Sequence, residues 1–298
     1  MGPGIALTLA LGGTKATIVS RSEENAAAGL AKARSQLKLL ADNGLTPADR
    51  AARAEGLLGS SADFETAISS ADIVVESAPE NMDFKQDLFA RMDALAKPAT
   101  ALCSNTSGLS ITAIASRCAR PERVVTTHFW NPPHLMPLVE IVKGEKTDHF
   151  LAADLKEYLT GCGKVAVVVK RDTPGQLGNR LQMALVREAV HIVEAGIADV
   201  EEVDAAAKNG FGLRLPVYGI FEHQDIVGLD MGGGIVDYVS KDLYNEPRAP
   251  QIMKDLVARG ELGAKTGKGF YDWSQKSADE VKARRDAFVM DFLKRWRQ

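Results

Sequence analysis

This sequence of 298 residues has few cysteines and lacks long apolar runs. Its acidic and basic residues are nearly equal in number. Its three cysteines, Cys103, Cys118 and Cys162, are an odd number without CxxC spacing, which excludes a disulfide framework and predicts no zinc or other metal site. The 36 basic residues against 39 acidic ones lack the basic excess that nucleic-acid binders usually carry. We therefore expect small-molecule partners, no nucleic acid, and a reducing, cytoplasmic setting.

The first residues resemble a targeting signal only briefly. Their apolar run, from Ile5 to Leu11, is far shorter than the roughly 20 residues of a membrane span, and no basic residue precedes it. Ala6 stands where the myristoylation pattern needs Ser or Thr. We therefore expect no association with a membrane.

Segments typical of strands alternate with helical segments in the first half of the chain. The strand-like runs are rich in β-branched residues and apolar along their whole length, as expected for strands covered on both faces. They are residues 16–20, 72–78, 99–105, 123–129, 138–142 and 165–170. This rhythm predicts an α/β fold with a Rossmann-like, doubly wound, largely parallel sheet. A helical insert from about Glu23 to Ala54 is too long for a plain crossover.

The second half of the chain is mostly helical in its pattern. Apolar residues recur at helical spacing from Leu177 to Val193, and no convincing strand appears before Gly269. A capping box beginning at Asp199 predicts a helix that ends before Gly210. We therefore expect a dinucleotide-binding domain over residues 1–171 and an all-helical domain over residues 172–298.

His128 and Glu140 are the strongest candidates for chemistry. Glu140 lies in an apolar strand-like run, where a carboxylate is costly unless it is paired, and a histidine is its natural partner. Such a pair holds the imidazole in one tautomer and stabilises it when it takes a proton. The alternative is a structural histidine beside a buried ion pair, and from spacing alone both interpretations stay open.

Other polar side chains follow the predicted strands, where ligands of open parallel sheets collect. Residues 76–85 follow one strand, and the cluster from Ser104 to Ser107 follows another. The cluster is also typical of a helix cap before Ile111, and both roles can coexist. Asn179 begins the first long helix of the second half, where it is alone a weak signal.

Four segments together resemble the 3-hydroxyacyl-CoA dehydrogenase family, whose superfamily also includes carnitine and L-gulonate 3-dehydrogenases. They are SNTSGLSIT at 104–112, HFWNPPHLMPLVEIV at 128–142, DTPGQLGNR at 172–180 and KTGKGFYDW at 265–273. No segment is decisive alone, but four in the family's order are specific, and they span nearly the whole chain.

The resemblance implies an oxidoreductase that reversibly oxidises the 3-hydroxy group of a short-chain 3-hydroxyacyl-CoA with NAD, in fatty acid metabolism. It implies that His128 is the general base, that Glu140 orients it, and that Ser107 and Asn179 hydrogen-bond the substrate oxygen. A homodimer through the helical domain is implied as well. The residues that match cofactor positions of the family are Glu80, Lys85, Ser107 and Asn131.

The family's dinucleotide motif, a strand followed by Gly-x-Gly-x-x-Gly and a helix, is present only at its end. Gly2 takes the position of the last glycine, and the first strand with the first two glycines is absent. Because the absent strand is central in this sheet order, its loss would unpair two neighbours. We expect a start codon placed too late or a trimmed sequence, with a true truncation that damages cofactor binding as the alternative.

A second departure lies at the end of the first remaining strand. An acidic residue usually binds the ribose 2′-hydroxyl of NAD there, whereas this chain has Ser20 and Arg21. An Arg suits the 2′-phosphate of NADP, although Arg21 could equally stack on adenine or face solvent. The resemblance favours NAD, and NADP is the alternative.

The carrier of the acyl group stays open as well. The insert of residues 23–54 has nearly balanced charges and no marked phosphate-binding patch, and residues 128–140 share features with the free-acid enzymes of the superfamily. We expect a 3-hydroxyacyl-CoA first and a free 3-hydroxy acid of carnitine or L-gulonate type next. A cofactor-deficient, non-catalytic homologue is a further alternative, which the presence of Ser107, His128, Glu140 and Asn179 together disfavours.

Overall fold

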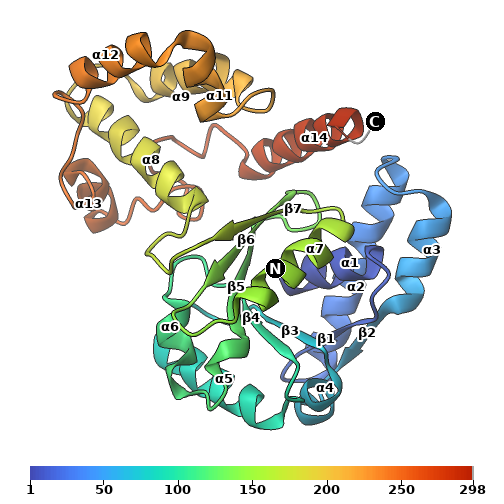
Figure 1. Cartoon of the computed structure of the whole chain (residues 1–298). Helices are drawn as coiled ribbons and strands as arrows, with labels where there is room; N and C mark the ends of the chain where they lie inside the picture. Colours follow the sequence, from blue (N-terminus) through green and yellow to red (C-terminus); the bar gives the residue numbers. More distant parts are fainter. Residues whose placement is uncertain (297–298) are drawn as a thin grey trace. The chain divides into compact units, whose positions relative to one another are not determined.

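The computed structural model describes residues 1–296, which form two compact units (Figure 1). Unit 1 comprises Met1–Arg180 and the chain from Ala283 onward, and unit 2 comprises Leu181–Lys282. The division expected after residue 171 therefore differs from that of the compact units, because the end of the last helix belongs to unit 1.

The strands of unit 1 form a sheet in two parts. In the first part, β1 (Ala16–Val19) pairs in parallel with β2 (Leu58–Ser61). The second part has the order β3-β4-β5-β6-β7, with β3 at Ile73–Glu76, β4 at Ala101–Ser104, β5 at Val124–Phe129, β6 at Leu138–Lys143 and β7 at Val165–Val169. Within the described residues no strand joins the two parts, and the break falls where the predicted order puts the strand missing from the motif.

The largely parallel sheet is confirmed, with one antiparallel pairing, between β5 and β6. Their connection, residues 130–137, is too short for a parallel crossover, which needs roughly a dozen residues or more. In this register His128 lies directly opposite Glu140. The hairpin therefore brings together two residues that are separated along the chain.

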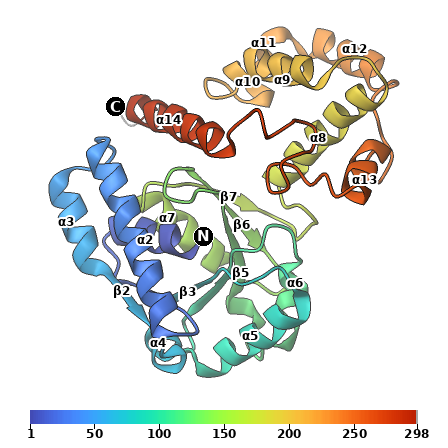
Figure 2. The ribbon, with the colours of Figure 1, turned by 180° about the vertical axis from the view of Figure 1, so that it is seen from behind.

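Helices cover both faces of the second part of the sheet (Figures 1 and 2). Leu102 of β4 and Val124 of β5 pack with α5 (Met82–Leu95) and α6 (Ile111–Ile114). Their neighbours Cys103 and Val125 pack with α1 (Gly2–Leu11) and α7 (His149–Gly161). Because successive side chains of a strand point to opposite faces, these apolar runs fill two cores.

The remaining helices of unit 1 follow the first strand. The predicted insert forms α2 (Glu23–Asp42) and α3 (Ala48–Leu57), which pack with α1 and β1 in a third apolar cluster. α4 (Phe64–Ser70) precedes β3. The helix cap expected from residues 104–107 is wrong: Ser104 ends β4, and Ser110 caps α6 by accepting the N–H of Ala113.

Unit 2 is helical, as predicted. It holds most of α8 (Gly178–Glu194), then α9 (Val200–Asn209), α10 (Phe211–Arg214), α11 (Ile220–Val227), α12 (Leu229–Val239), α13 (Gln251–Ala258) and the start of α14 (Ala278–Trp296). Gly210 follows α9 as predicted, but the capping box is wrong, because the Asp199 side chain makes no capping hydrogen bond. The buried residues of Leu181–Lys282 are Val190, Gly232 and Pro250 alone.

Residues 1–296 contain neither a membrane-spanning helix nor a cluster of metal-binding side chains. None of the helices there combines the length and the apolar character needed to cross a membrane. The same residues contain no group of three or more His, Cys, Asp or Glu side chains arranged to hold a metal ion.

Candidate active site

The centre of the site is a buried pair on the β5–β6 hairpin. The Nδ1 atom of His128 lies 2.8 Å from Oε2 of Glu140. His128 is 7% exposed and Glu140 is fully buried. Antiparallel pairing creates this contact, because residues directly opposite each other present their side chains on the same face.

Glu140 accepts further hydrogen bonds from three donors around it. The indole Nε1 of Trp130 donates to Oε2 at 2.9 Å, and the backbone N–H groups of Leu177 and Gly178 donate to Oε1 at 2.9 and 2.8 Å. Burial alone would raise the pKa of Glu140, but the hydrogen bond from His128 and these further donors lower it to about 2. The carboxylate is therefore ionised at neutral pH.

A carboxylate that stays ionised fixes the tautomer of the histidine beside it. Glu140 can only accept, so Nδ1 of His128 carries the proton and donates. This leaves Nε2 without a protein partner among residues 1–296. The arrangement can therefore take up a proton at Nε2 while a negative charge faces the other side of the ring.

Ser107 and Asn179 are hydrogen-bonded to each other, next to the backbone donors of Glu140 at the start of α8. The Nδ2 atom of Asn179 donates to the carbonyl oxygen of Ser107 at 2.8 Å. The side chain of Ser107 has no hydrogen-bond partner within the described part of the chain. Asn179 lies next to Gly178, one of the donors to Glu140, so one short segment of α8 connects both features.

The segment between β3 and α5 supports the Ser107 loop through the carboxylate of Glu80. Glu80 accepts the backbone N–H of Ser107 at 2.6 Å and the hydroxyl of Thr106 at 2.9 Å. Lys85 is 1% exposed, and its Nζ lies 2.7 Å from Oε1 of Glu76 and 3.5 Å from Oε2 of Glu80. The ammonium of Lys85 thus lies between the buried carboxylate of Glu76 and the exposed carboxylate of Glu80.

The other predicted cofactor residues lie on three different segments of unit 1. Gly2 is the first residue of α1, and Ser20 and Arg21 follow β1. Asn131 lies in the β5–β6 connection and precedes Pro132 across a cis peptide bond. Within residues 1–296, none of these four residues forms a hydrogen bond or an ion pair with His128 or Glu140.

Three residues that hold the site together lie in segments noted in the sequence, but none of them was assigned a role of its own there. Trp130 binds Glu140, Glu76 binds Lys85 and the hydroxyl of Ser104, and Gln176 binds the carbonyl of Thr106. A signal existed for Trp130, which lies two residues after His128 as strand partners on one face do. A signal also existed for Glu76, because a carboxylate at the end of an apolar run needs a partner.

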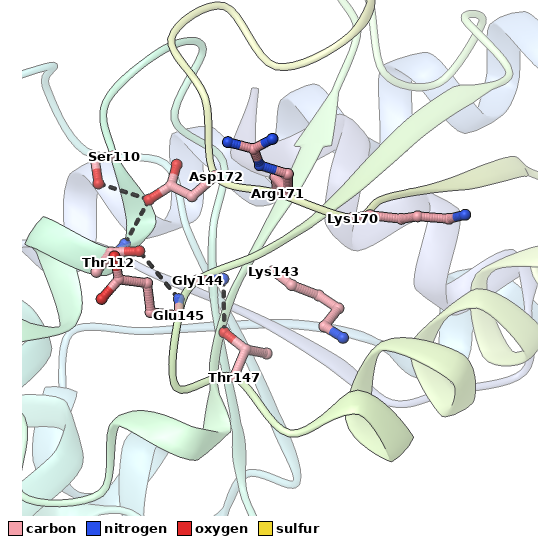
Figure 3. A pocket seen from close by; sticks show the side chains of 9 residues that line it. All are labelled: Ser110, Thr112, Lys143, Gly144, Glu145, Thr147, Lys170, Arg171 and Asp172. Carbon is pink, nitrogen blue, oxygen red and sulfur yellow. Dashed lines mark hydrogen bonds between the residues drawn. The ribbon is translucent and has the colours of Figure 1, made fainter.

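A separate polar cavity of about 460 Å³ opens beyond the carboxyl ends of β6 and β7 (Figure 3). None of the predicted site residues lines it. Figure 3 shows the hydroxyl of Ser110 and the N–H of Thr112 directed at the carboxylate of Asp172, at 2.6 and 2.9 Å. The lining residues are Ser110, Thr112, Lys143, Gly144, Glu145, Thr147, Lys170, Arg171 and Asp172.

Comparison with known proteins decides the family. Residues 1–173 match the model of the 3-hydroxyacyl-CoA dehydrogenase NAD-binding domain, and residues 175–273 match that of the 3-hydroxyacyl-CoA dehydrogenase C-terminal domain. The chain belongs to the 3-hydroxyacyl-CoA dehydrogenase family. It is an NAD-dependent oxidoreductase, and NAD is its cofactor.

Relatives within the family differ in their substrates. The chain is 33% identical to the 5-formyl-3-hydroxy-2-methylpyridine 4-carboxylate 5-dehydrogenase of Mesorhizobium japonicum, over 96% of this chain and 91% of that protein. It is 35% identical to a probable 3-hydroxybutyryl-CoA dehydrogenase of Bacillus subtilis, over 93% and 96%. It is also 35% identical to the L-carnitine dehydrogenase of Streptomyces coelicolor, over 78% and 72%.

A solved structure of a related enzyme has a similar fold. The crystal structure of a 5-formyl-3-hydroxy-2-methylpyridine 4-carboxylic acid 5-dehydrogenase, an NAD⁺-dependent dismutase, matches with a TM-score of 0.88 at 32% identity. The match covers 98% of this chain and 93% of that one. The fold therefore agrees with that of the family over nearly the full length of both chains.

The residues at the amino end of α1 suit a dinucleotide. A Cβ atom at Gly2 would meet nothing within 4 Å, so the backbone at the positive end of this ten-residue helix is open to a phosphate. Arg21 is exposed and forms no ion pair with the described residues. These positions fit the pyrophosphate and the adenosine end of NAD.

Proposed function

We propose that His128 is the general base of a reversible oxidation of a 3-hydroxy group to a ketone. The observation that carries this proposal is the buried His128–Glu140 pair, which leaves Nε2 as the atom able to accept the hydroxyl proton. Glu140 stabilises the imidazolium that results. In the reverse direction His128 returns the same proton to the substrate oxygen.

Ser107 and Asn179 hold the substrate oxygen in this proposal. Both lie on segments tied to the His128 pair, and the Ser107 hydroxyl has no partner within residues 1–296. Hydrogen bonds from a hydroxyl and an amide strengthen as charge grows on the oxygen, and they need no rearrangement during the reaction.

NAD, when bound, accepts the hydride that leaves C3 of the substrate. Gly2 would hold the pyrophosphate through the start of α1, and Ser20 with Arg21 would lie at the adenosine end. Glu80, Ser107 and Asn131 would lie at the nicotinamide half, with Lys85 fixing Glu80 from within the fold. Arg21 would also accept a 2′-phosphate, so NADP is a second cofactor to test.

A short-chain 3-hydroxyacyl-CoA is the first candidate substrate, because both domain models that match the chain describe enzymes of this class. Acetoacetyl-CoA with NADH is the corresponding test in the direction of reduction. Efficient turnover of the thioester, with none of free acetoacetate, would support this substrate.

A free 3-hydroxy acid is the second candidate, and the charges on α2 and α3 favour it. Arg34, Lys38 and Arg53 already form ion pairs with carboxylates of the same two helices. Arg50 donates to the carbonyl of Leu11. Few cations there are free for the phosphates of CoA, and two of the relatives described above carry the names of enzymes for free carboxylates.

Substitution of the base tests the reaction itself. We expect His128→Gln to reduce turnover by roughly 10²–10⁴, the range for loss of a general base, and to leave the Kd for NADH nearly unchanged. His149→Gln, on the exposed start of α7, is the matched control and should turn over normally. Normal turnover by His128→Gln would remove His128 from the mechanism.

We further propose that the protein is a homodimer through unit 2. The apolar side chains of Val217, Phe221 and Tyr238 are 82, 84 and 80% exposed there. Exposed apolar surface on this scale marks an interface more often than a free surface. A second copy of the chain is the partner that the family resemblance implies.

A further inference from the structure

The segment from Asp172 to Asn179, which we call the β7–α8 linker, is fastened to the site at several points. At its start, Asp172 accepts the hydroxyl of Ser110 and the N–H of Thr112 (Figure 3). At its end, Gly178 donates to Glu140 and Asn179 donates to Ser107. The linker thus carries Gly178, which binds Glu140, and Asn179, which in the proposed reaction binds the substrate oxygen.

Gln176 lies in the middle of this linker in an unusual conformation. It is the one residue other than glycine with a positive φ among residues 1–296, at 54°. Such a backbone is strained for a residue with a Cβ atom, and it persists only where the surroundings over-determine it. Gln176 is also 4% exposed, so its amide is enclosed by protein.

The buried amide of Gln176 makes one hydrogen bond and leaves one group without a partner. Nε2 donates to the carbonyl oxygen of Thr106 at 2.9 Å. Because that carbonyl can only accept, the amide cannot be turned around, and Oε1 stays buried without a donor in the described part of the chain. An apolar side chain of similar size would remove this unsatisfied acceptor but would leave the carbonyl of Thr106, a buried residue, without its donor.

We infer that Gln176 is a positioning residue that ties the Thr106–Ser107 loop to the β7–α8 linker. The bond from Gln176 to Thr106 and the bond from Asn179 to Ser107 form two adjacent cross-links between these segments. Together they hold the Ser107 hydroxyl and the Asn179 amide in register with the donors to Glu140. This inference rests on the proposed function, in which these groups bind the substrate oxygen.

The test compares Gln176→Met with Gln86→Met. Gln86 is a matched control, because its Nε2 also donates to a backbone carbonyl, that of Ala113 at 2.8 Å, away from the site. We expect Gln176→Met to lower kcat about tenfold, since small misplacement of reacting groups is costly, with KM and the Kd for NADH changed less than twofold. The melting temperature should change little, because loss of the unsatisfied oxygen is offset by the Thr106 carbonyl losing its donor. Gln86→Met should keep kcat.

Amide hydrogen exchange gives a readout that does not need turnover. We expect the amides of Ser107, Leu177 and Gly178 to exchange faster in Gln176→Met, and those of β4 and β5 to stay unchanged. Unchanged exchange together with kcat within twofold of the wild type would overturn the inference. A wild type that neither turns over a 3-hydroxy substrate nor binds NADH would contradict the proposed function. The exchange rates would still show whether Gln176 ties the Thr106–Ser107 loop to the β7–α8 linker.

A second variant keeps the test decisive if the methionine variant folds poorly. Gln176→Gly removes the same hydrogen bond but suits a positive φ, so backbone strain is relieved. Loss of kcat in Gln176→Gly, with the same pattern of faster exchange, supports the cross-link as the cause. Full activity of this variant would show that the bond to Thr106 does not position the site.

Discussion

Glu140 shows at the scale of one residue how a buried charge is tolerated. Four donors surround its two oxygens, from His128, Trp130, Leu177 and Gly178, and they offset the cost of removing a carboxylate from water. Removal of any one donor leaves part of a buried charge uncompensated. The carboxylate is therefore a structural anchor as well as the partner of the proposed base.

The pKa of Glu140, lowered to about 2, predicts a dependence of stability on pH. A carboxyl whose pKa is depressed by folding contributes stability above its unfolded value of about 4.5, and this contribution is lost as the pH falls toward 2. We expect the difference in unfolding free energy between the wild type and Glu140→Gln to shrink by roughly 1 kcal/mol per pH unit below pH 4.5. Urea unfolding at pH 6, 4.5 and 3.5 measures it, and a constant difference would contradict the prediction.

The pairing of His128 with Glu140 could be predicted from sequence because a carboxylate in an apolar strand demands a partner. Gln176 gave no such signal, because its bond to Thr106 joins residues far apart along the chain in a conformation that no local pattern indicates. Lys85 was expected near the cofactor, and the sequence did not indicate that Glu76 would bury its ammonium. The residues around a buried polar side chain thus indicate that it needs a partner, but they do not indicate which residue that partner is.

At the scale of elements, the start of α8 and the β5–β6 connection depend on close contact at Gly178. A Cβ atom there would lie 2.5 Å from Cζ2 of Trp130. We expect Gly178→Ala to displace the indole, to weaken its bond to Glu140, and to lower kcat by roughly 10- to 100-fold with a stability loss of about 1–3 kcal/mol.

The control for this prediction is Gly56→Ala, in the last turn of α3. A Cβ atom at Gly56 would meet nothing within 4 Å, so this variant should be as active as the wild type and slightly more stable. Thermal unfolding and steady-state turnover of both variants measure the contrast. Equal behaviour of the two alanine variants would show that the contact with Trp130 is unimportant.

Elements with strong patterns were predicted well, and elements set by tertiary contacts were not. Six strands follow from their β-branched runs, whereas β2 has the sequence LGSS and forms only by pairing with β1. The antiparallel direction of β6 depends on the length of a connection rather than on its residues. The helix α6 begins at Ile111 as expected, but Ser110, and no residue of the 104–107 cluster, is the residue whose oxygen accepts the N–H of Ala113.

At the scale of the whole molecule, the two units differ in how much of themselves they bury. Unit 1 contains three apolar clusters, whereas Leu181–Lys282 buries only Val190, Gly232 and Pro250. In the proposed homodimer, a second copy of the chain would cover apolar surface of this helical unit and so add to its stability. The sequence predicted its helices from their periodicity, but the same apolar stripes do not indicate whether this chain or a second copy packs against them.

The homodimer predicts a mass near twice 32.0 kDa at micromolar concentration, measured by light scattering on a sizing column. Phe221→Glu places a charge on an 84% exposed ring of α11, so it should weaken the dimer and shift the mass toward the monomer. Phe150→Glu makes the same change on a 66% exposed ring of α7 in unit 1 and should leave the mass unchanged. A wild type that is monomeric would contradict the dimer. A dimer that resists Phe221→Glu but dissociates with Phe150→Glu would move the interface to unit 1.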